Sequence, residues 1–173
     1  MRIVLRADAG IDRGTGHVMR CLTVGEALKQ AGHSVVLMGQ IEGVEWLTRH
    51  VEQTGIEHHA CERDDLRLSA LEAMGADRVV VDSYWIDPGD IATADAAIPT
   101  MVIVDNDIRG IRASYYLDQN LGAESGYWEG VEGTVLAGSR YALVRRAILE
   151  QRVSSGWDIP GRESHVVAFM GGT

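Results

Sequence analysis

The chain has 173 residues, 46% of them hydrophobic, which is enough for one domain with a sizeable core. Its formal net charge is −9, from 25 acidic and 16 basic residues. No basic patch stands out, which argues against a nucleic-acid partner. No apolar run approaches the roughly 20 residues of a membrane span. Charged residues come too early for a signal peptide, and Cys21 and Cys61 are typical of free thiols. We therefore expect a cytoplasmic protein without a membrane partner.

Short apolar runs alternate with helical patterns along the chain. The runs at residues 3–5, 34–38, 79–81 and 101–104 are largely β-branched, which predicts buried parallel strands. Helices are predicted at residues 17–30, 44–53, 65–74 and 88–97. Shorter strands are predicted at residues 115–117 and 134–136, and a further helix at 141–151. This alternation predicts an α/β fold, a Rossmann-like parallel sheet with helices on both faces.

The last part of the chain has a different character. Residues 153–163 carry loop signals, and residues 165–170 predict a strand that runs into Gly171, Gly172 and Thr173. A strand and a glycine turn should be followed by a helix, so we expect a second lobe to begin here and to be truncated. The predicted division is therefore an amino-terminal lobe over residues 1–152, then an interlobe linker with the first strand and glycine turn of the second lobe over residues 153–173.

The most informative motif follows the first strand and leads into the first helix, over residues 6–9 and 14–17. It is neither a dinucleotide fingerprint, because Met19 replaces the third glycine, nor a P-loop, which needs Gly-Lys-Ser/Thr. The free amides at the start of a helix can still hold an anion or a polar sugar group. His17 stands at the positive end of this helix, which favours the neutral imidazole that a general base requires. The alternative is that His17 only caps or packs the turn.

Other polar residues follow the predicted strands. Asp8 could bind substrate hydroxyls, orient His17 or bind amides of its own loop. Arg6 and Arg20 could neutralise an anionic ligand or form ordinary ion pairs.

Two further segments are expected at the same edge of the sheet. Asp82 and Tyr84 follow the third strand and should reach the crevice of His17, where Tyr84 could stack on a sugar or donate a hydrogen bond. Asp105 and Asp107 lack a histidine or third acid at metal-ligand spacing, so we interpret them as turn residues. The pair at residues 58 and 59, both histidines, is expected to be exposed.

The combined pattern resembles the UDP-2,4-diacetamido-2,4,6-trideoxy-β-L-altropyranose hydrolase family of pseudaminic acid biosynthesis, and related spore coat polysaccharide biosynthesis proteins. The matching segments are Arg6-Ala7-Asp8-Ala9, Gly14-Thr15-Gly16-His17-Val18-Met19-Arg20-Cys21-Leu22, Asp82-Ser83-Tyr84, Val104-Asp105, Gly138-Ser139-Arg140-Tyr141-Ala142-Leu143-Val144-Arg145 and Met170-Gly171-Gly172-Thr173.

This resemblance implies the amino-terminal lobe of a GT-B-like two-lobed enzyme. Such an enzyme hydrolyses a UDP-linked amino sugar at the anomeric carbon, releasing UDP and the free sugar, without a metal or cofactor. It implies that His17 is the general base for water. It also implies a set of substrate-binding residues, namely Asp8, Gly16, Arg20, Tyr84 and Tyr141 in this lobe and Gly171, Gly172 and Thr173 in the loop that grips UDP.

Without its second lobe the chain is expected to be inactive. Two alternatives stay open: a GT-B glycosyltransferase that uses an acceptor hydroxyl, and a non-catalytic sugar-binding lobe.

Overall fold

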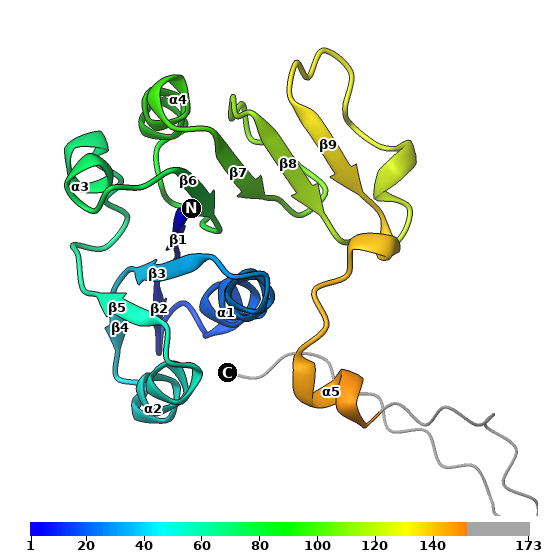
Figure 1. Ribbon diagram of the computed structural model, residues 1–173. Coiled ribbons are helices and arrows are strands. Elements are labelled where there is room, and N and C mark those ends of the chain that lie inside the picture. The colour runs from blue at the N-terminus through cyan, green and yellow to red at the C-terminus, as the bar shows by residue number, and fades with distance from the viewer. Residues whose placement is uncertain (152–173) are drawn as a thin grey trace, which may run out of the picture.

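A computed structural model describes residues 1–151, which form a seven-stranded parallel sheet with helices on both faces (Figure 1). The strand order is β5-β3-β1-β6-β7-β8-β9. The strands are β1 (Arg2–Arg6), β3 (Ser34–Met38), β5 (Glu57–His59), β6 (Arg78–Val81), β7 (Thr100–Ile103), β8 (Tyr115–Asp118) and β9 (Thr134–Ala137). The chain builds outward from β1 in one direction and then from β6 in the other. The carboxyl ends of β1 and β6 therefore form a topological switch point, where open α/β sheets bind ligands.

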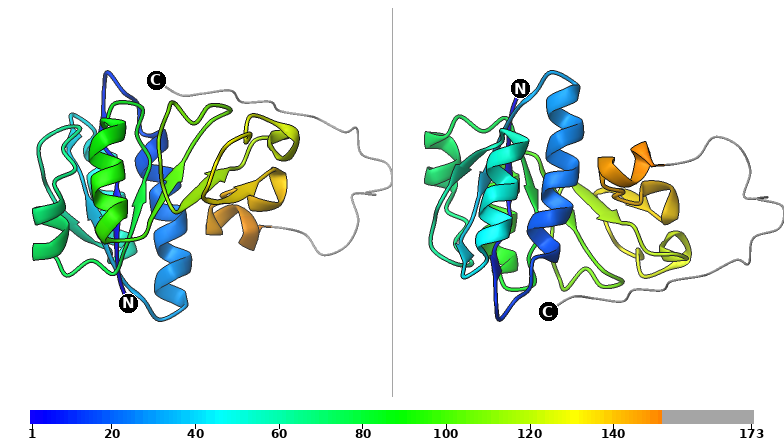
Figure 2. Two further views of the ribbon diagram at one scale, coloured as in Figure 1. Left: turned by 90° about the horizontal axis from the view of Figure 1, so that it is seen from above. Right: turned by 90° about the horizontal axis from the view of Figure 1, so that it is seen from below.

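The helices divide between the two faces of the sheet. Helices α1 (Gly16–Gln30) and α2 (Glu45–Thr54) cover one face, and α3 (Leu68–Ala73) and α4 (Pro88–Ala97) cover the other, as the two opposite views of Figure 2 show. Each face has its own core, because successive side chains of a strand point to opposite sides. Leu5 of β1 packs in the core under α1 and α2, while its neighbour Val4 packs in the core under α3 and α4.

The remaining elements are short. A two-stranded parallel sheet joins β2 (Ala9–Gly10) to β4 (Ile41–Glu42), just beyond the ends of β1 and β3. Two 3₁₀ turns, η1 (Ala123–Ser125) and η2 (Ser139–Tyr141), precede and follow β9, and the helix α5 (Arg146–Glu150) comes last. In the part of the chain that is described, no helix has the length and hydrophobicity needed to cross a membrane.

The predicted fold class is confirmed, and each strand predicted within residues 1–151 is present to within one residue at either end. The predicted helix at residues 141–151 is wrong. The chain instead makes the turn η2, becomes extended at Ala142 (ψ 126°), and is helical only in α5, where no residue is buried. A helix that buries no apolar face gains little from packing, which explains its shortness. The helix predicted at residues 65–74 is likewise reduced to α3.

Part of the predicted organisation lies outside the described residues. This applies to the strand at residues 165–170 and to Gly171, Gly172 and Thr173. The division between residues 152 and 153 stays a prediction.

Gly39 places the chain after β3 against the loop after β1. A Cβ atom at this position would lie 1.8 Å from the carbonyl oxygen of Ala7, far inside van der Waals contact. The Gly39 amide also donates a hydrogen bond of 3.0 Å to the His59 carbonyl, so the backbone is held from the other side. Only glycine fits here.

We expect Gly39→Ala to lower the free energy of unfolding by about 3 kcal/mol or more, because the backbone must move to relieve the overlap. Denaturant unfolding measures this. The matched control is Gly16→Ala, since a Cβ at Gly16 meets no atom within 4 Å. Equal stability of the two variants would contradict the prediction.

Candidate functional site

The candidate site lies at the carboxyl edge of the sheet, around the ends of β1, β6 and β7. Helix α1 begins at Gly16, and its residues His17 and Arg20 are three positions apart, so they lie on one face of its first turns. No side chain caps the amino end of α1. Asp82 follows β6 directly, and its amide donates a 3.0 Å hydrogen bond to the Arg6 carbonyl at the end of β1. Three segments far apart in the sequence therefore meet here.

Arg20 joins two of these segments through its guanidinium group. Its Nε and one terminal nitrogen donate to the two carboxylate oxygens of Asp82, both at 2.8 Å. Its other terminal nitrogen donates to the carboxylate of Asp105, at 2.8 and 2.9 Å. We call this group, Arg20 with Asp82 and Asp105, the Arg20 clamp. It ties α1 to the ends of β6 and β7 through charge-assisted hydrogen bonds.

The two carboxylates of the clamp differ in their surroundings. Asp82 is buried, which raises its pKa to about 7 even though the bidentate contact from Arg20 favours the ionised form. Burial also acts on Asp105, yet hydrogen bonds from Tyr84 and Arg20 lower its pKa below the ordinary value. The clamp thus places two carboxylates against one guanidinium.

His17 lies beside the clamp with 7% of its surface exposed. Its Nε2 atom is 3.8 Å from Oδ1 of Asp82, and neither ring nitrogen makes a hydrogen bond within residues 1–151. Burial, and next the positive charge of Arg20, lower the pKa of His17 to about 4. The imidazole is therefore neutral at pH 7, in the direction that the sequence predicts, although burial is the largest cause.

Two aromatic side chains surround the His17 ring. The centre of the Tyr84 ring is 4.7 Å from the centre of the His17 ring, and the centre of the Trp85 ring is 5.6 Å from it. Both pairs have edge-to-face geometry. They stay 46% and 44% exposed. The Tyr84 hydroxyl donates to the Asp105 carboxylate and so touches the clamp. The buried His17 ring thus packs edge-to-face against two half-exposed aromatic rings.

Two more arginines lie on these rings. The Arg13 guanidinium is 4.0 Å from the Trp85 ring centre and also pairs with Asp64. The Arg109 guanidinium is 5.0 Å from the Tyr84 ring centre and donates to the Ser83 carbonyl at 2.8 Å. Both arrangements are typical of cation–π contacts, which hold an aromatic side chain in place.

Asp8 is close to this site in sequence but has its own partners. It forms a buried bidentate ion pair with Arg6 at 2.7 and 2.9 Å, and it accepts hydrogen bonds from the amides of Gln40 (2.7 Å) and Asp64 (3.0 Å). Burial alone would raise the pKa of Asp8, but Arg6 and the two amides lower it. Of the roles open to Asp8, its contacts show the binding of loop amides, and none of them is to His17.

The structure thus brings together only part of the predicted site. His17, Arg20 and Tyr84 are adjacent, and Gly16 opens the same helix. Tyr141 packs against the core of the α1 face, and within residues 1–151 no hydrogen bond or ring contact joins it to His17. Arg20 makes its hydrogen bonds to carboxylates, so its contact with a substrate stays a prediction.

Sequence reasoning missed several residues of the site. Trp85, Arg13 and Arg109 were not proposed for it, and Asp105 was assigned to turn chemistry. The one signal available was that Asp105 follows β7, the strand next to β6, and therefore ends at the same edge. The contacts of both arginines depend on loop conformations that a sequence pattern does not specify.

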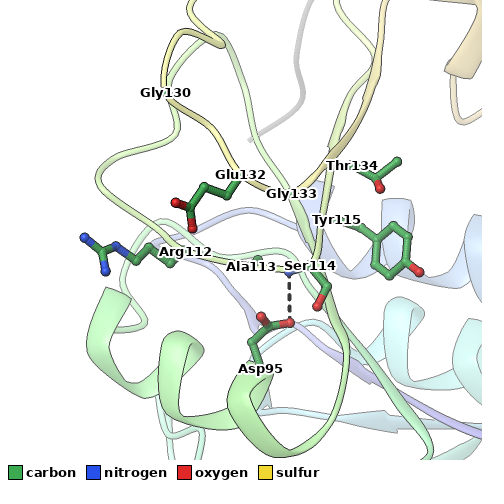
Figure 3. A pocket seen from close by; sticks show the side chains of 9 residues that line it. All are labelled: Asp95, Arg112, Ala113, Ser114, Tyr115, Gly130, Glu132, Gly133 and Thr134. Atoms are coloured by element: carbon green, nitrogen blue, oxygen red, sulfur yellow. Dashed lines mark hydrogen bonds between the residues drawn. The ribbon is translucent and has the colours of Figure 1, made fainter.

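A pocket of about 530 Å³ lies elsewhere, near the amino ends of β8 and β9 (Figure 3). It is lined by Asp95, Arg112, Ala113, Ser114, Tyr115, Gly130, Glu132, Gly133 and Thr134. Asp95 accepts a 2.9 Å hydrogen bond from the Ser114 amide, which fixes one wall. None of the predicted site residues within residues 1–151 lines this pocket.

Comparisons with known proteins support the fold. The sequence matches no protein-family profile and no curated protein. Its structure is that of one lobe of a GT-B fold. It is similar to the solved structure of MurG from Acinetobacter baumannii, with a TM-score of 0.54 and 11% sequence identity. The match covers 89% of this chain and 50% of the MurG chain, so this chain spans about half the length of that protein.

We expect Asp8→Asn to lower the free energy of unfolding by about 3–5 kcal/mol, because the fully buried Arg6 loses its counter-charge. Asp12→Asn is the matched control, since its 2.9 Å ion pair with Arg63 is exposed and should contribute less than about 1 kcal/mol. Denaturant unfolding of both variants compares them. A loss for Asp8→Asn no larger than for Asp12→Asn would contradict the buried-pair argument.

His17 should make stability fall in mild acid. Because its folded pKa is about 4 and its ordinary value 6.5, the unfolded chain takes up the proton first. Stability is therefore fully present above pH 6.5 and decreases as the pH falls to 4, by on the order of 3 kcal/mol from this group. His17→Gln removes this contribution, so the variant should gain stability relative to wild type as the pH falls. Parallel pH dependences in denaturant unfolding would contradict the assigned shift.

Proposed function

We propose that this chain is the nucleophile-binding lobe of a GT-B-type enzyme that hydrolyses a UDP-linked amino sugar at the anomeric carbon. The observation that carries the proposal is the His17 imidazole, which is neutral at pH 7 and free of hydrogen bonds within residues 1–151. It lies at the edge of a parallel sheet where such folds bind ligands. The reaction type and the class of sugar in this proposal come from the sequence motifs that resemble the hydrolase family.

In the proposed reaction His17 takes a proton from water as the water oxygen attacks the anomeric carbon. The bond between that carbon and the diphosphate oxygen breaks, and its electron pair leaves on UDP, with inversion at the anomeric carbon. Tyr84 lines the sugar side, since its ring contacts His17 and is half exposed. A second lobe would hold UDP. The half-length match to MurG supports a two-lobed protein of this kind.

Glycosyl transfer is the second candidate, because MurG is a GT-B glycosyltransferase. In that case His17 would deprotonate an acceptor hydroxyl in place of water. Product analysis distinguishes the two reactions. Release of UDP and free sugar without any acceptor supports hydrolysis, whereas UDP release that requires an acceptor, with formation of an adduct, supports transfer.

We expect His17→Asn to lower kcat for UDP release by about 10²–10⁴-fold in the proposed two-lobed enzyme, because a positioned general base contributes about that much. The matched control is His59→Asn, which alters an exposed histidine on β5 and should leave kcat unchanged. Wild-type turnover by His17→Asn would refute the role of His17. Binding of UDP-sugars in calorimetry, without turnover by the wild-type protein, would instead support the non-catalytic sugar-binding lobe.

A further inference from the structure

The carboxylate of Asp82 can accept more hydrogen bonds than Arg20 donates to it. Its two carboxylate oxygens each accept one hydrogen bond from Arg20, and each oxygen has a second lone pair. Oδ1 lies 3.8 Å from Nε2 of His17, which is too far for a hydrogen bond but within reach of a small ring movement. Asp82 is 1% exposed, so water does not compete strongly for this lone pair.

The charged groups around His17 act in opposite directions on a proton on its ring. Arg20, Arg13 and Arg109 oppose such a proton, whereas Asp105 favours it, and Tyr84 faces the ring as a neutral phenol. Arg13 is itself paired with Asp64. Within the Arg20 clamp two carboxylates share one guanidinium, so the clamp by itself carries one excess negative charge when both carboxylates are ionised. An imidazolium at His17 would neutralise the group.

We propose that Asp82 is the positioning residue for His17: its carboxylate accepts a hydrogen bond from Nε2–H, which leaves Nδ1 free to take the proton of the nucleophile. The catalytic step is the one already given, with Nδ1 as the atom that receives the proton and Nε2 keeping its own proton, so that no proton passes to Asp82. Arg20 then acts through Asp82, by holding its carboxylate in place, rather than by binding the substrate. The proton transfer to Nδ1 rests on the proposed function, whereas the hydrogen bond between Nε2–H and Asp82 does not.

The first test is the tautomer of His17, measured by long-range ¹H–¹⁵N correlation at pH 7. We expect the Nε2–H tautomer to predominate in the wild-type protein. This measurement needs neither a substrate nor a variant, so it decides the hydrogen bond even where the proposed reaction is wrong. A predominant Nδ1–H tautomer would overturn the proposal.

Two variants then separate positioning from a merely structural role. Asp82→Asn and Asp105→Asn each remove one carboxylate from the Arg20 clamp, but only Asp82 faces Nε2 of His17. We expect Asp82→Asn to lose the tautomer preference and to lower kcat by about 10²-fold or more with little change in KM. Asp105→Asn should keep the Nε2–H tautomer. If both variants retain the wild-type tautomer, or both lose it equally, Asp82 has no special relation to His17 and the proposal fails.

Misfolding of Asp82→Asn would be visible in the loss of spectral dispersion. In that case the proposal is decided by the His17 tautomer of the wild-type protein. If the tautomer is Nε2–H but no protein form releases UDP, the positioning contact stands and the proposed function fails, so the two failures are distinguishable.

Discussion

The Arg20 clamp is the interaction on which the candidate site depends. A guanidinium group has a fixed planar arrangement of donors, so it can hold two carboxylates only when both approach in defined directions. Here the carboxylates come from the ends of β6 and β7, and the guanidinium comes from the second turn of α1. Because these strands are parallel neighbours, their carboxyl ends lie at one edge of the sheet. Arg20 binds both carboxylates there, and since His17 is on the same helix, the Arg20 clamp sets the position of His17 relative to Asp82.

A second buried ion pair performs a similar task for the loops above the sheet. Arg6 ends β1, and its partner Asp8 binds the amides of Gln40 and Asp64. Asp64 has a left-handed backbone (φ 60°), which costs free energy for a residue with a Cβ, and its bonds to Asp8 and Arg13 offset that cost. Through Arg13 this loop reaches the ring of Trp85. The segments after β1 and β5 are therefore connected to the aromatic side of the site.

The sequence was informative where one physical rule dominates. Residues 79–81 and 101–104 are continuous apolar runs that are largely β-branched, which is typical of strands in a sheet covered on both faces, so the core strands were predictable. His17 was predictable as well, because a glycine turn before a helix leaves a polar residue at the strand ends. β5 was not, since its residues Glu57, His58 and His59 are all exposed and its strand exists only by pairing with β3. The role of Asp8 was also open, because hydrogen-bond donors from three separate points of the chain, Arg6, Gln40 and Asp64, had to be placed before it could be decided.

In the proposed enzyme, the distribution of charge argues against this lobe holding the diphosphate by itself. The arginines near His17 already have partners: Arg20 has two carboxylates, Arg13 has Asp64, and Arg109 donates to the Ser83 carbonyl. With a formal net charge of −9 on the chain, little positive charge remains to stabilise an anionic leaving group. What this edge offers instead is a neutral imidazole and half-exposed aromatic rings, to which the proposed function assigns an uncharged nucleophile and a sugar. In the proposed enzyme the negative charge that develops as UDP leaves must therefore be stabilised by amides or cations outside residues 1–151, which is the division of labour that two lobes facing one cleft allow.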